Sequence, residues 1–234
     1  YVTEFSRRFM GTLWNTYAFY VLYADIDSFD PSEHTLDVEN LPVMDKWLLS
    51  RLYSTVRDVD DHLANYRIPE AARALESFID ECSNWYVRRC RERFWAKGME
   101  QDKVNAYMTL FTALEVFCRA AAPMIPFMTE NIYQNIVRPV IKDAPESIHL
   151  CDFPKVREEL IDTVLEENMG TLLEVVVLGR ACRNSANLKN RQPLSQMFVN
   201  TAKPLDEFYT HIIEDELNIK KVVYREDISE YVSY

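Results

Sequence analysis

The chain has 234 residues, of which 48% are hydrophobic and 27% are charged. These proportions are typical of globular proteins, so they exclude a disordered chain and a protein made mainly of membrane spans. The formal net charge at pH 7 is −11. The surface as a whole therefore repels phosphate, and a site for an anion has to be a local feature.

The glycines and cysteines argue against several kinds of site. The four glycines are far apart, so the sequence contains no glycine-rich phosphate loop of the Rossmann or P-loop kind. The five cysteines are odd in number and never spaced as Cys-x-x-Cys, which disfavours a disulfide framework and a structural zinc site. We therefore expect a reducing, cytoplasmic setting.

The first residues carry no basic-then-apolar signal, and charged residues or prolines interrupt the apolar runs before they reach the roughly 18 residues of a membrane span. We expect neither export nor membrane insertion. The sequence begins with Tyr1, within a helical pattern, which suggests a piece of a longer protein.

Helical periodicity dominates the first two thirds of the sequence, where apolar residues recur at steps of three and four. This spacing predicts helices over residues 5–24, 44–66, 69–95, 101–122 and 127–137. Pro69 suits the first turn of its helix, and Gly98 can supply a left-handed cap after Trp95. Residues 25–42 are rich in turn-forming residues, which predicts a long surface connection.

The pattern becomes mixed after Pro139. We expect an extended segment at 147–150, a long helix from the acidic stretch near 158 to about 188, and a helix over 205–217 between strands 197–199 and 222–224. The predicted fold class is mainly α. A helical bundle over residues 1–155 precedes a small α+β appendage over residues 156–234.

One predicted helix carries a concentration of positive charge. Residues 84–97 contain five cations and one acid. At about 100° per residue, Asn84, Arg88, Arg91 and Trp95 fall on the side opposite the apolar face, and we call these four residues the basic stripe. Guanidinium groups pair with phosphate and indole rings stack on bases, which is the chemistry that single-stranded RNA requires. The alternative is a solvated face on which Arg88 pairs with Glu81 or Glu92.

Three further residues of this helix lie beside the stripe, and a second group of cations lies later in the sequence. Trp85 lies on the flank of the stripe, where either core packing or RNA contact is open. Arg89 and Arg93 project toward the apolar side, so we expect them either to snorkel to the surface or to pair with acids of a neighbouring helix, at positions 58, 60 or 61. A second basic cluster, with four cations and no acid, runs from residue 180 to 191, and its Arg180, Arg183 and Asn187 fall on one helical face at steps of three and four. Its residue types fit phosphate contact and plain solvent exposure equally well.

Catalytic constellations are missing from the sequence. The four histidines are scattered, with neither metal-ligand spacing nor a triad pattern. The carboxylates are plentiful, but the sequence identifies no buried pair for acid–base catalysis. The chain thus offers binding features and no catalytic centre.

The segment Asn84–Trp95 closely resembles the helix that marks the anticodon-binding domain of isoleucyl-tRNA synthetases. Five further segments support the resemblance, and together they cover nearly the whole chain: Leu13–Tyr17, Asp45–Ser50, Ala121–Phe127, Glu146–Leu150 and Arg191–Ser195. The segment from Asn187 through Ser195 is similar to the branch of these enzymes found in eukaryotes and some bacteria. The sequence departs from the family pattern at Cys90, where a small serine is expected, and at Asn190, where an aliphatic residue is commoner.

Two alternatives stay open beside this resemblance. Valyl- and leucyl-tRNA synthetases share the helical bundle of this class I group, although valyl enzymes carry acidic and lysine-rich residues where Val87-Arg88-Arg89 stands here. A non-enzymatic helical module that binds an acidic partner protein is the other alternative.

The resemblance implies a parent enzyme that activates isoleucine with ATP and Mg²⁺, transfers it to tRNA(Ile) and edits errors. The signature sequences of the adenylation site are absent here and are expected upstream, so the fragment should have no catalytic residue and no cofactor of its own. Its expected partners are tRNA(Ile) and the upstream catalytic and editing domains, with neither DNA nor a membrane. The residues expected to contact tRNA are Asn84, Trp85, Arg88, Arg91, Trp95, Arg180, Arg183, Asn187, Lys189, Arg191 and Gln192.

Overall fold

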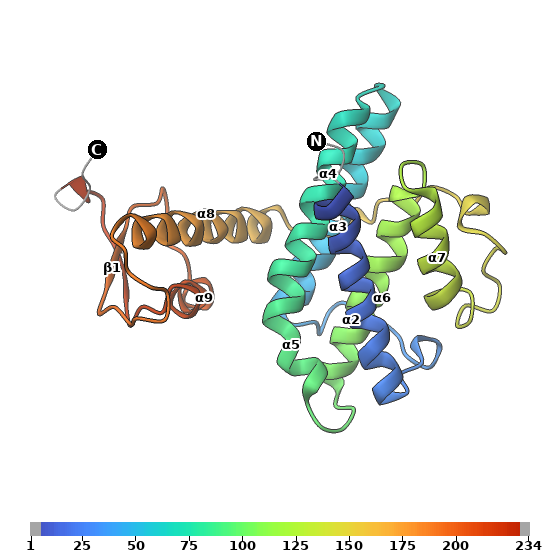
Figure 1. Cartoon of the computed structure of the whole chain (residues 1–234), viewed down its shortest axis with the longest axis horizontal. Coiled ribbons are helices and arrows are strands. Elements are labelled where there is room, and N and C mark those ends of the chain that lie inside the picture. Colours follow the sequence, from blue (N-terminus) through green and yellow to red (C-terminus); the bar gives the residue numbers. More distant parts are fainter. Residues whose placement is uncertain (1–5, 230–234) are drawn as a thin grey trace. The chain divides into compact units, whose positions relative to one another are not determined.

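A computed structural model describes residues 6–229 of the chain. Within that range two compact units form, residues 6–161 and residues 162–229, and each is described by itself (Figure 1). The first unit contains, in chain order, the π-helical segment Ser6–Met10, α2 (Gly11–Asp27), α3 (Val43–Ala64), α4 (Ile68–Glu81), the π-helical segment Cys82–Val87, α5 (Arg88–Trp95), α6 (Gln101–Ala121) and α7 (Pro126–Ile136). Short 3₁₀ turns lie at Pro31–Glu33, Ile148–Leu150 and Glu158–Leu160.

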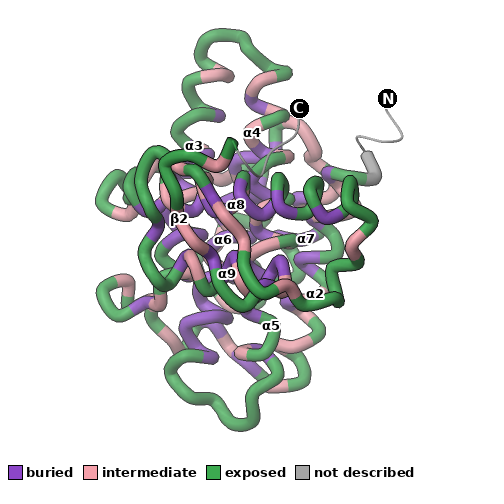
Figure 2. Tube along the Cα trace, turned by 90° about the vertical axis from the view of Figure 1, so that its left-hand side faces the viewer, coloured by how far each residue is buried: buried purple, intermediate pink, exposed green. Residues whose placement is uncertain are grey.

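The core of the first unit is built around α6. Its residues from Lys103 to Phe111 are all buried, and the burial continues over most of the remaining helix (Figure 2). The Tyr107 ring is stacked on Phe29 at 4.6 Å and meets Phe94 of α5 edge-on at 5.0 Å, measured between ring centroids. Because Phe94 is 1% exposed, α5 is fixed to the core by one face and leaves its other face to solvent.

The predicted helices of the bundle are confirmed, although position 5 lies outside the described residues. Their spacing did not indicate two π-helical segments, Ser6–Met10 at the start of the first helix and Cys82–Val87. The predicted helix over 69–95 begins at Ile68 and passes through the π-helical segment Cys82–Val87 before α5. The backbone stays in the right-handed helical region at Cys82 and Arg88, so the helix continues through this segment. Single-turn π segments of this kind occur often at functional sites.

The extended segment predicted at 147–150 is wrong. Ile148–Leu150 is a 3₁₀ turn, whose Ser147 hydroxyl accepts a hydrogen bond from the His149 amide at 3.2 Å. The Glu130 carboxylate of α7 accepts from the Ile148 amide at 2.9 Å and from the Ser147 hydroxyl at 2.9 Å. Side chains thus satisfy the groups that a strand neighbour would otherwise bond.

The second unit is a small α+β assembly. It contains α8 (Thr163–Ser185), β1 (Met197–Val199), α9 (Glu207–Leu217) and β2 (Val222–Tyr224). The two predicted strands form as expected and pair in parallel, with Met197 opposite Val222, and α9 makes the crossover between them. Asp162 caps α8, because its carboxylate accepts from the Leu165 amide at 2.9 Å.

The division between the units falls after Ile161, whereas the sequence predicted it after residue 155. Residues 156–161 belong with the first unit, where Glu158 lies 3.4 Å from the guanidinium of Arg57 on α3. The long helix that the acidic stretch predicted therefore begins at Thr163 and ends at Ser185, a little short of residue 188.

A glycine makes close packing possible in the second unit. A Cβ atom on Gly179 of α8 would lie 2.3 Å from Cδ1 of Leu217, which is 0% exposed on α9. We expect Gly179→Ala to lower the free energy of unfolding of this unit by about 1–3 kcal/mol, because the buried leucine has to move. Gly170→Ala is the matched control in the same helix: nothing lies within 4 Å of its Cβ position, so it should stabilise the helix by about 0.5–1 kcal/mol.

Hydrogen exchange of the α8 and α9 amides measures both glycine variants. Equal protection in Gly179→Ala and Gly170→Ala would contradict the close packing of the two helices.

Candidate nucleic-acid interface

One face of the helix that contains α5 is polar and open to solvent. Asn84, Arg88 and Arg91 are exposed, and the Trp95 indole is 53% exposed. The basic stripe therefore lies on the surface, as the helical spacing predicted. The opposite face carries Phe94, which is buried against α6.

Two arginine–tryptophan pairs lie along this face. Cζ of Arg88 is 5.4 Å from the ring centroid of Trp85, and Cζ of Arg91 is 5.6 Å from that of Trp95. Both distances fall within the range of cation–π attraction, about 6 Å. Trp85 is half-buried. Each pair places a guanidinium beside a flat ring, so it can offer a phosphate contact and a stacking surface together.

The Arg88 side chain bonds to the backbone of its own helix. Its Nε donates to the carbonyl oxygen of Asn84 at 2.7 Å, and the Asn84 amide donates to Asp80 at 2.7 Å. Glu81 accepts two hydrogen bonds from Arg51, at 2.9 and 3.2 Å. Glu81 therefore pairs with Arg51 of α3, and the Arg88 side chain lies beside the helical turn that contains Asn84.

Arg93 anchors the stripe from behind. Its guanidinium donates to both oxygens of Asp45 at 2.6 and 2.8 Å, and its Nε donates to Asp102 at 2.9 Å. The Tyr86 hydroxyl also donates to Asp45 at 2.7 Å. The expected pairing of Arg93 with an acid at 58, 60 or 61 is wrong, because Arg93 lies beside the first turns of α3 and α6 instead. Arg89 is half-buried.

Electrostatics keep this anchor charged. Burial alone would lower the pKa of the Arg93 guanidinium, but hydrogen bonding to Asp45 and the charges around it raise the pKa above its ordinary value. Burial also raises the pKa of the nearby Tyr86 hydroxyl, which stays a proton donor to Asp45. Asp45 itself is 0% exposed, so the pair is a buried, bidentate ion pair.

The carboxyl end of α5 is fixed by a second ion pair. Nζ of Lys103, which is 4% exposed, lies 2.6 Å from Asp27 and donates to the carbonyl oxygen of Ala96 at 2.8 Å. The cation suits the negative end of the α5 dipole. Trp95, directly before Ala96, is thereby held at a defined place on the surface.

The second basic cluster does not form one exposed face. Arg183 is 4% exposed, so its prediction as a tRNA contact on a surface face shared with Arg180 and Asn187 is wrong. Its guanidinium donates to carbonyl oxygens within the unit and is turned inward. Arg180 is exposed, and its guanidinium lies 2.6 Å from the carboxylate of the buried Glu216.

The remaining predicted residues of this cluster are at the surface. Asn187 has a φ of +55°, in the left-handed region, and the chain leaves the helical direction there. Beyond the end of α8, the side chains of Asn187, Lys189, Arg191 and Gln192 are exposed. These four residues can meet an anion without rearrangement of the fold.

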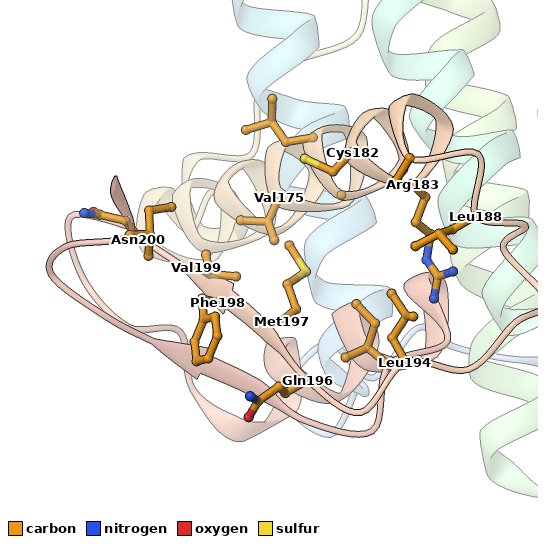
Figure 3. Close-up of a pocket in the computed structure, with 15 residues that line it drawn as sticks. Val175, Cys182, Arg183, Leu188, Leu194, Gln196, Met197, Phe198, Val199 and Asn200 are labelled. Carbon is orange, nitrogen blue, oxygen red and sulfur yellow. The ribbon is translucent and has the colours of Figure 1, made fainter. Parts of the chain in front are cut away.

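A cavity of about 490 Å³ lies between α8 and β1 (Figure 3). Apolar side chains such as Val175, Leu188 and Met197 line most of it. Arg183 is the one cation among the residues that line it. The cavity therefore offers little to a phosphate, and it is separate from the exposed cations of the same unit.

Other site types find little support over residues 6–229. No group of three or more histidine, cysteine, aspartate or glutamate side chains in that range could hold a metal ion. All five cysteines are free thiols. None of the helices in the described range combines the length and hydropathy that a membrane crossing requires.

Two residues that shape the interface were missed from the sequence. Asp45 shares a helical face with Leu48, Leu49 and Leu52, and an acid on such an apolar face indicates a buried ion pair. Asn190 departs from the family pattern, and its amide donates to the Glu216 carbonyl oxygen at 3.1 Å. The spacing of residues in the sequence could have identified Asp45, whereas the role of Asn190 follows only from the folded structure.

Comparison with known proteins adds a family to this geometry. The family described as the anticodon-binding domain of tRNA ligase matches residues 45–198. That range contains the whole basic stripe and the exposed residues that follow α8.

Curated relatives are similar over the whole chain. An isoleucine–tRNA ligase of Clostridium tetani is 53% identical over 233 residues, which is 100% of this chain and 22% of that protein. The protein of the same name from Clostridium kluyveri is 52% identical over 234 residues, with the same two shares. One from Dehalococcoides mccartyi is 42% identical over 229 residues, 96% of this chain and 22% of the relative. The chain thus spans about a fifth of the length of these relatives.

Proposed function

Because the chain belongs to the family of anticodon-binding domains of tRNA ligases, we propose that it binds the anticodon loop of tRNA(Ile). The contacts are made by the basic stripe with Trp85 in the first unit, and by Arg180, Asn187, Lys189, Arg191 and Gln192 in the second. The chain supplies recognition of tRNA and performs no chemistry of its own.

The observation that carries the proposal is the pair of arginine–tryptophan contacts on one helix, in which both arginines and Trp95 are exposed and Trp85 is half-buried. A chain with a net charge of −11 repels nucleic acid over most of its surface, so a cationic face has to be a local exception. Here the exception also carries two indole rings, at 5.4 and 5.6 Å from their arginines. Flat rings beside cations let the same face stack on unpaired bases and bind their phosphates.

The longer protein is proposed to ligate isoleucine to tRNA(Ile), as the names of the relatives state for those proteins. ATP and Mg²⁺ would serve that reaction in domains outside this chain. The proposed setting is the cytoplasm, with the catalytic and editing domains of the same protein as further partners, and with neither DNA nor a membrane.

Two single substitutions test the stripe. Trp95→Ala should weaken binding of tRNA(Ile) by about 5- to 150-fold, because one stacked base contributes about 1–3 kcal/mol. Arg88→Ala should reduce the slope of log K against log salt by about 0.7, the value for one phosphate contact with a single strand. Filter binding over a series of salt concentrations measures both quantities.

Controls separate recognition from folding. The Arg88 and Trp95 side chains are exposed, so each substitution should change the free energy of unfolding by no more than about 0.5 kcal/mol, as measured by thermal unfolding. Arg73→Ala, which removes another exposed cation of the same unit, should leave the salt slope unchanged. Equal binding of tRNA(Ile), tRNA(Val) and a DNA hairpin of the anticodon sequence would overturn anticodon recognition. Tight binding of an acidic protein, with none of tRNA, would favour the interaction module.

A further inference from the structure

The segment after α8 follows an irregular path with little regular backbone bonding of its own. The helix ends at Ser185, and the Leu188 amide then donates to the Arg183 carbonyl oxygen at 2.8 Å. The Gln192 amide donates to the Lys189 carbonyl oxygen at 2.9 Å, which closes a turn. We call residues 187–192 the basic segment. It contains Lys189 and Arg191 and no acid.

Arg183 holds this segment from inside the second unit (Figure 3). Its guanidinium donates to the carbonyl oxygens of Lys189 and Gln192, each at 3.0 Å. It also donates to those of Leu217 at 2.6 Å and Asn218 at 3.2 Å, at the carboxyl end of α9. One buried side chain therefore links α8, the basic segment and α9.

The charge of Arg183 has a local counterpart. The last carbonyl groups of a helix carry partial negative charge, and α9 ends at Leu217. Among residues 6–229, no carboxylate forms an ion pair with Arg183. The guanidinium is thus stabilised by backbone dipoles, and its position is set by the four carbonyl oxygens that it bonds.

A second brace acts on the same segment. The Asn190 amide donates to the Glu216 carbonyl oxygen at 3.1 Å, and the Asn218 amide donates to the Asn190 carbonyl oxygen at 3.3 Å. The backbone of the basic segment is thereby turned toward α9. The side chains of Lys189 and Arg191 remain exposed.

We propose that Arg183 is a positioning residue, which holds the basic segment in the conformation in which Lys189 and Arg191 contact tRNA phosphates. The inference rests on the proposed function, since it concerns how that contact is prepared. A segment ordered before binding loses less conformational entropy when the RNA arrives. Arg183 touches no RNA in this account and acts only through the carbonyl oxygens that it bonds.

The test uses Arg183→Lys in the 234-residue chain, with tRNA(Ile) as the probe. Lysine keeps the charge but lacks the planar fork that reaches several carbonyl groups, so a change in affinity reports geometry and not charge. We expect the Lys189→Ala/Arg191→Ala variant to bind about tenfold more weakly at 0.15 M salt, as for two phosphate contacts. Arg183→Lys alone should weaken binding several-fold, and it should add nothing when combined with the double variant.

Each outcome separates the two claims. If the double variant binds like the wild type, the proposed contact of the basic segment with tRNA fails. If the double variant is weakened but Arg183→Lys is not, the contact stands and the positioning role fails. An equal loss from Arg183→Lys in both backgrounds also overturns positioning. Lys220→Ala, which removes an exposed cation from the same unit, should leave affinity within twofold of the wild type and serves as the control.

A measurement on the wild type covers the case in which Arg183→Lys fails to fold. If Arg183 holds the segment ready, the amides of Leu188 and Gln192 are protected from hydrogen exchange before tRNA is added, because both are bonded in the free chain. Exchange of these two amides at unprotected rates, in a chain whose α9 amides are protected, would overturn the proposal.

Discussion

Asp45→Ala should lower the free energy of unfolding of the first unit by about 3 kcal/mol, the lower end of the range for breaking a buried ion pair. The substitution leaves the Arg93 cation without the carboxylate that accepts its hydrogen bonds at 2.6 and 2.8 Å. It also removes the nearer acceptor of the fully buried Tyr86 hydroxyl and leaves that hydroxyl the Ala106 carbonyl oxygen at 3.5 Å. The loss stays near the lower end because the Arg93 side chain is 16% exposed and keeps Asp102.

Tryptophan fluorescence is a selective probe for this experiment. All four tryptophans, Trp14, Trp47, Trp85 and Trp95, lie in the first unit, so the second unit does not contribute to the signal. For a unit of this size, Asp45→Ala should lower the midpoint temperature of thermal unfolding by roughly 6–12 °C.

The matched control is Asp102→Ala, which removes the other partner of Arg93. Because the Asp102 side chain is 57% exposed, we expect a loss of no more than about 1 kcal/mol. Similar losses for the two aspartates would contradict the view that the buried member of the network carries its stability.

The helical part of the fold was predictable because the residues that each helix buries can be identified from that helix's own sequence. Apolar residues at steps of three and four mark a buried face without reference to the rest of the chain. The 3₁₀ turn at Ile148–Leu150 depends instead on Glu130, which is far away in sequence but accepts from its backbone. The short, partly apolar segment therefore predicted an extended conformation. The sequence pattern did not show that the Glu130 carboxylate would accept the hydrogen bond of the Ile148 amide.

The candidate interface divides in the same way. The exposure of Arg88, Arg91 and Trp95 followed from angular spacing within one uninterrupted helix. Arg183 and Asn187 were placed by the same angular spacing. Asn187 lies beyond the end of α8, where its left-handed backbone redirects the chain, whereas Arg183 lies within α8. Arg183 then meets the carboxyl end of α9, a contact that spacing along a single helix does not contain.

The partner of Arg93 shows a related limit. Its charge and its position near the apolar side predicted either snorkelling or an ion pair with a neighbouring helix, and the structure contains an ion pair, with Asp45. Which acid pairs with Arg93 depends on the arrangement of three helices, since Asp45 lies in the first turn of α3 and Asp102 in the first turn of α6. Residue type thus indicates that a buried cation is paired, while tertiary packing decides with what.

Tyr107→Ala should lower the free energy of unfolding of the first unit by about 3–5 kcal/mol, as for other large aromatic truncations in a core. The ring is 0% exposed and contacts Phe29, Phe94 and Tyr20 at centroid distances of 4.6, 5.0 and 6.2 Å. Its removal leaves a cavity that these rings cannot fill without moving.

Tyr107→Phe isolates the hydroxyl from the ring. Burial raises the pKa of Tyr107, so its hydroxyl stays protonated and donates to Asp27 at 2.5 Å. Asp27 keeps Lys103 at 2.6 Å when the hydroxyl is lost, so the cost should be about 1 kcal/mol. Tryptophan fluorescence during denaturant unfolding compares the two variants. A larger loss of unfolding free energy for Tyr107→Phe than for Tyr107→Ala would contradict the role of ring packing.

The same pair of variants connects the core with recognition of tRNA. Phe94 lies against Tyr107 on the buried side of α5, directly before Trp95 on the exposed side. Loss of the Tyr107 ring lets Phe94 shift, and the stripe then shifts with it. Below its unfolding transition, Tyr107→Ala should therefore bind tRNA(Ile) more weakly than Tyr107→Phe, although neither side chain reaches the RNA. Equal affinities would mean that α5 keeps its orientation without this contact.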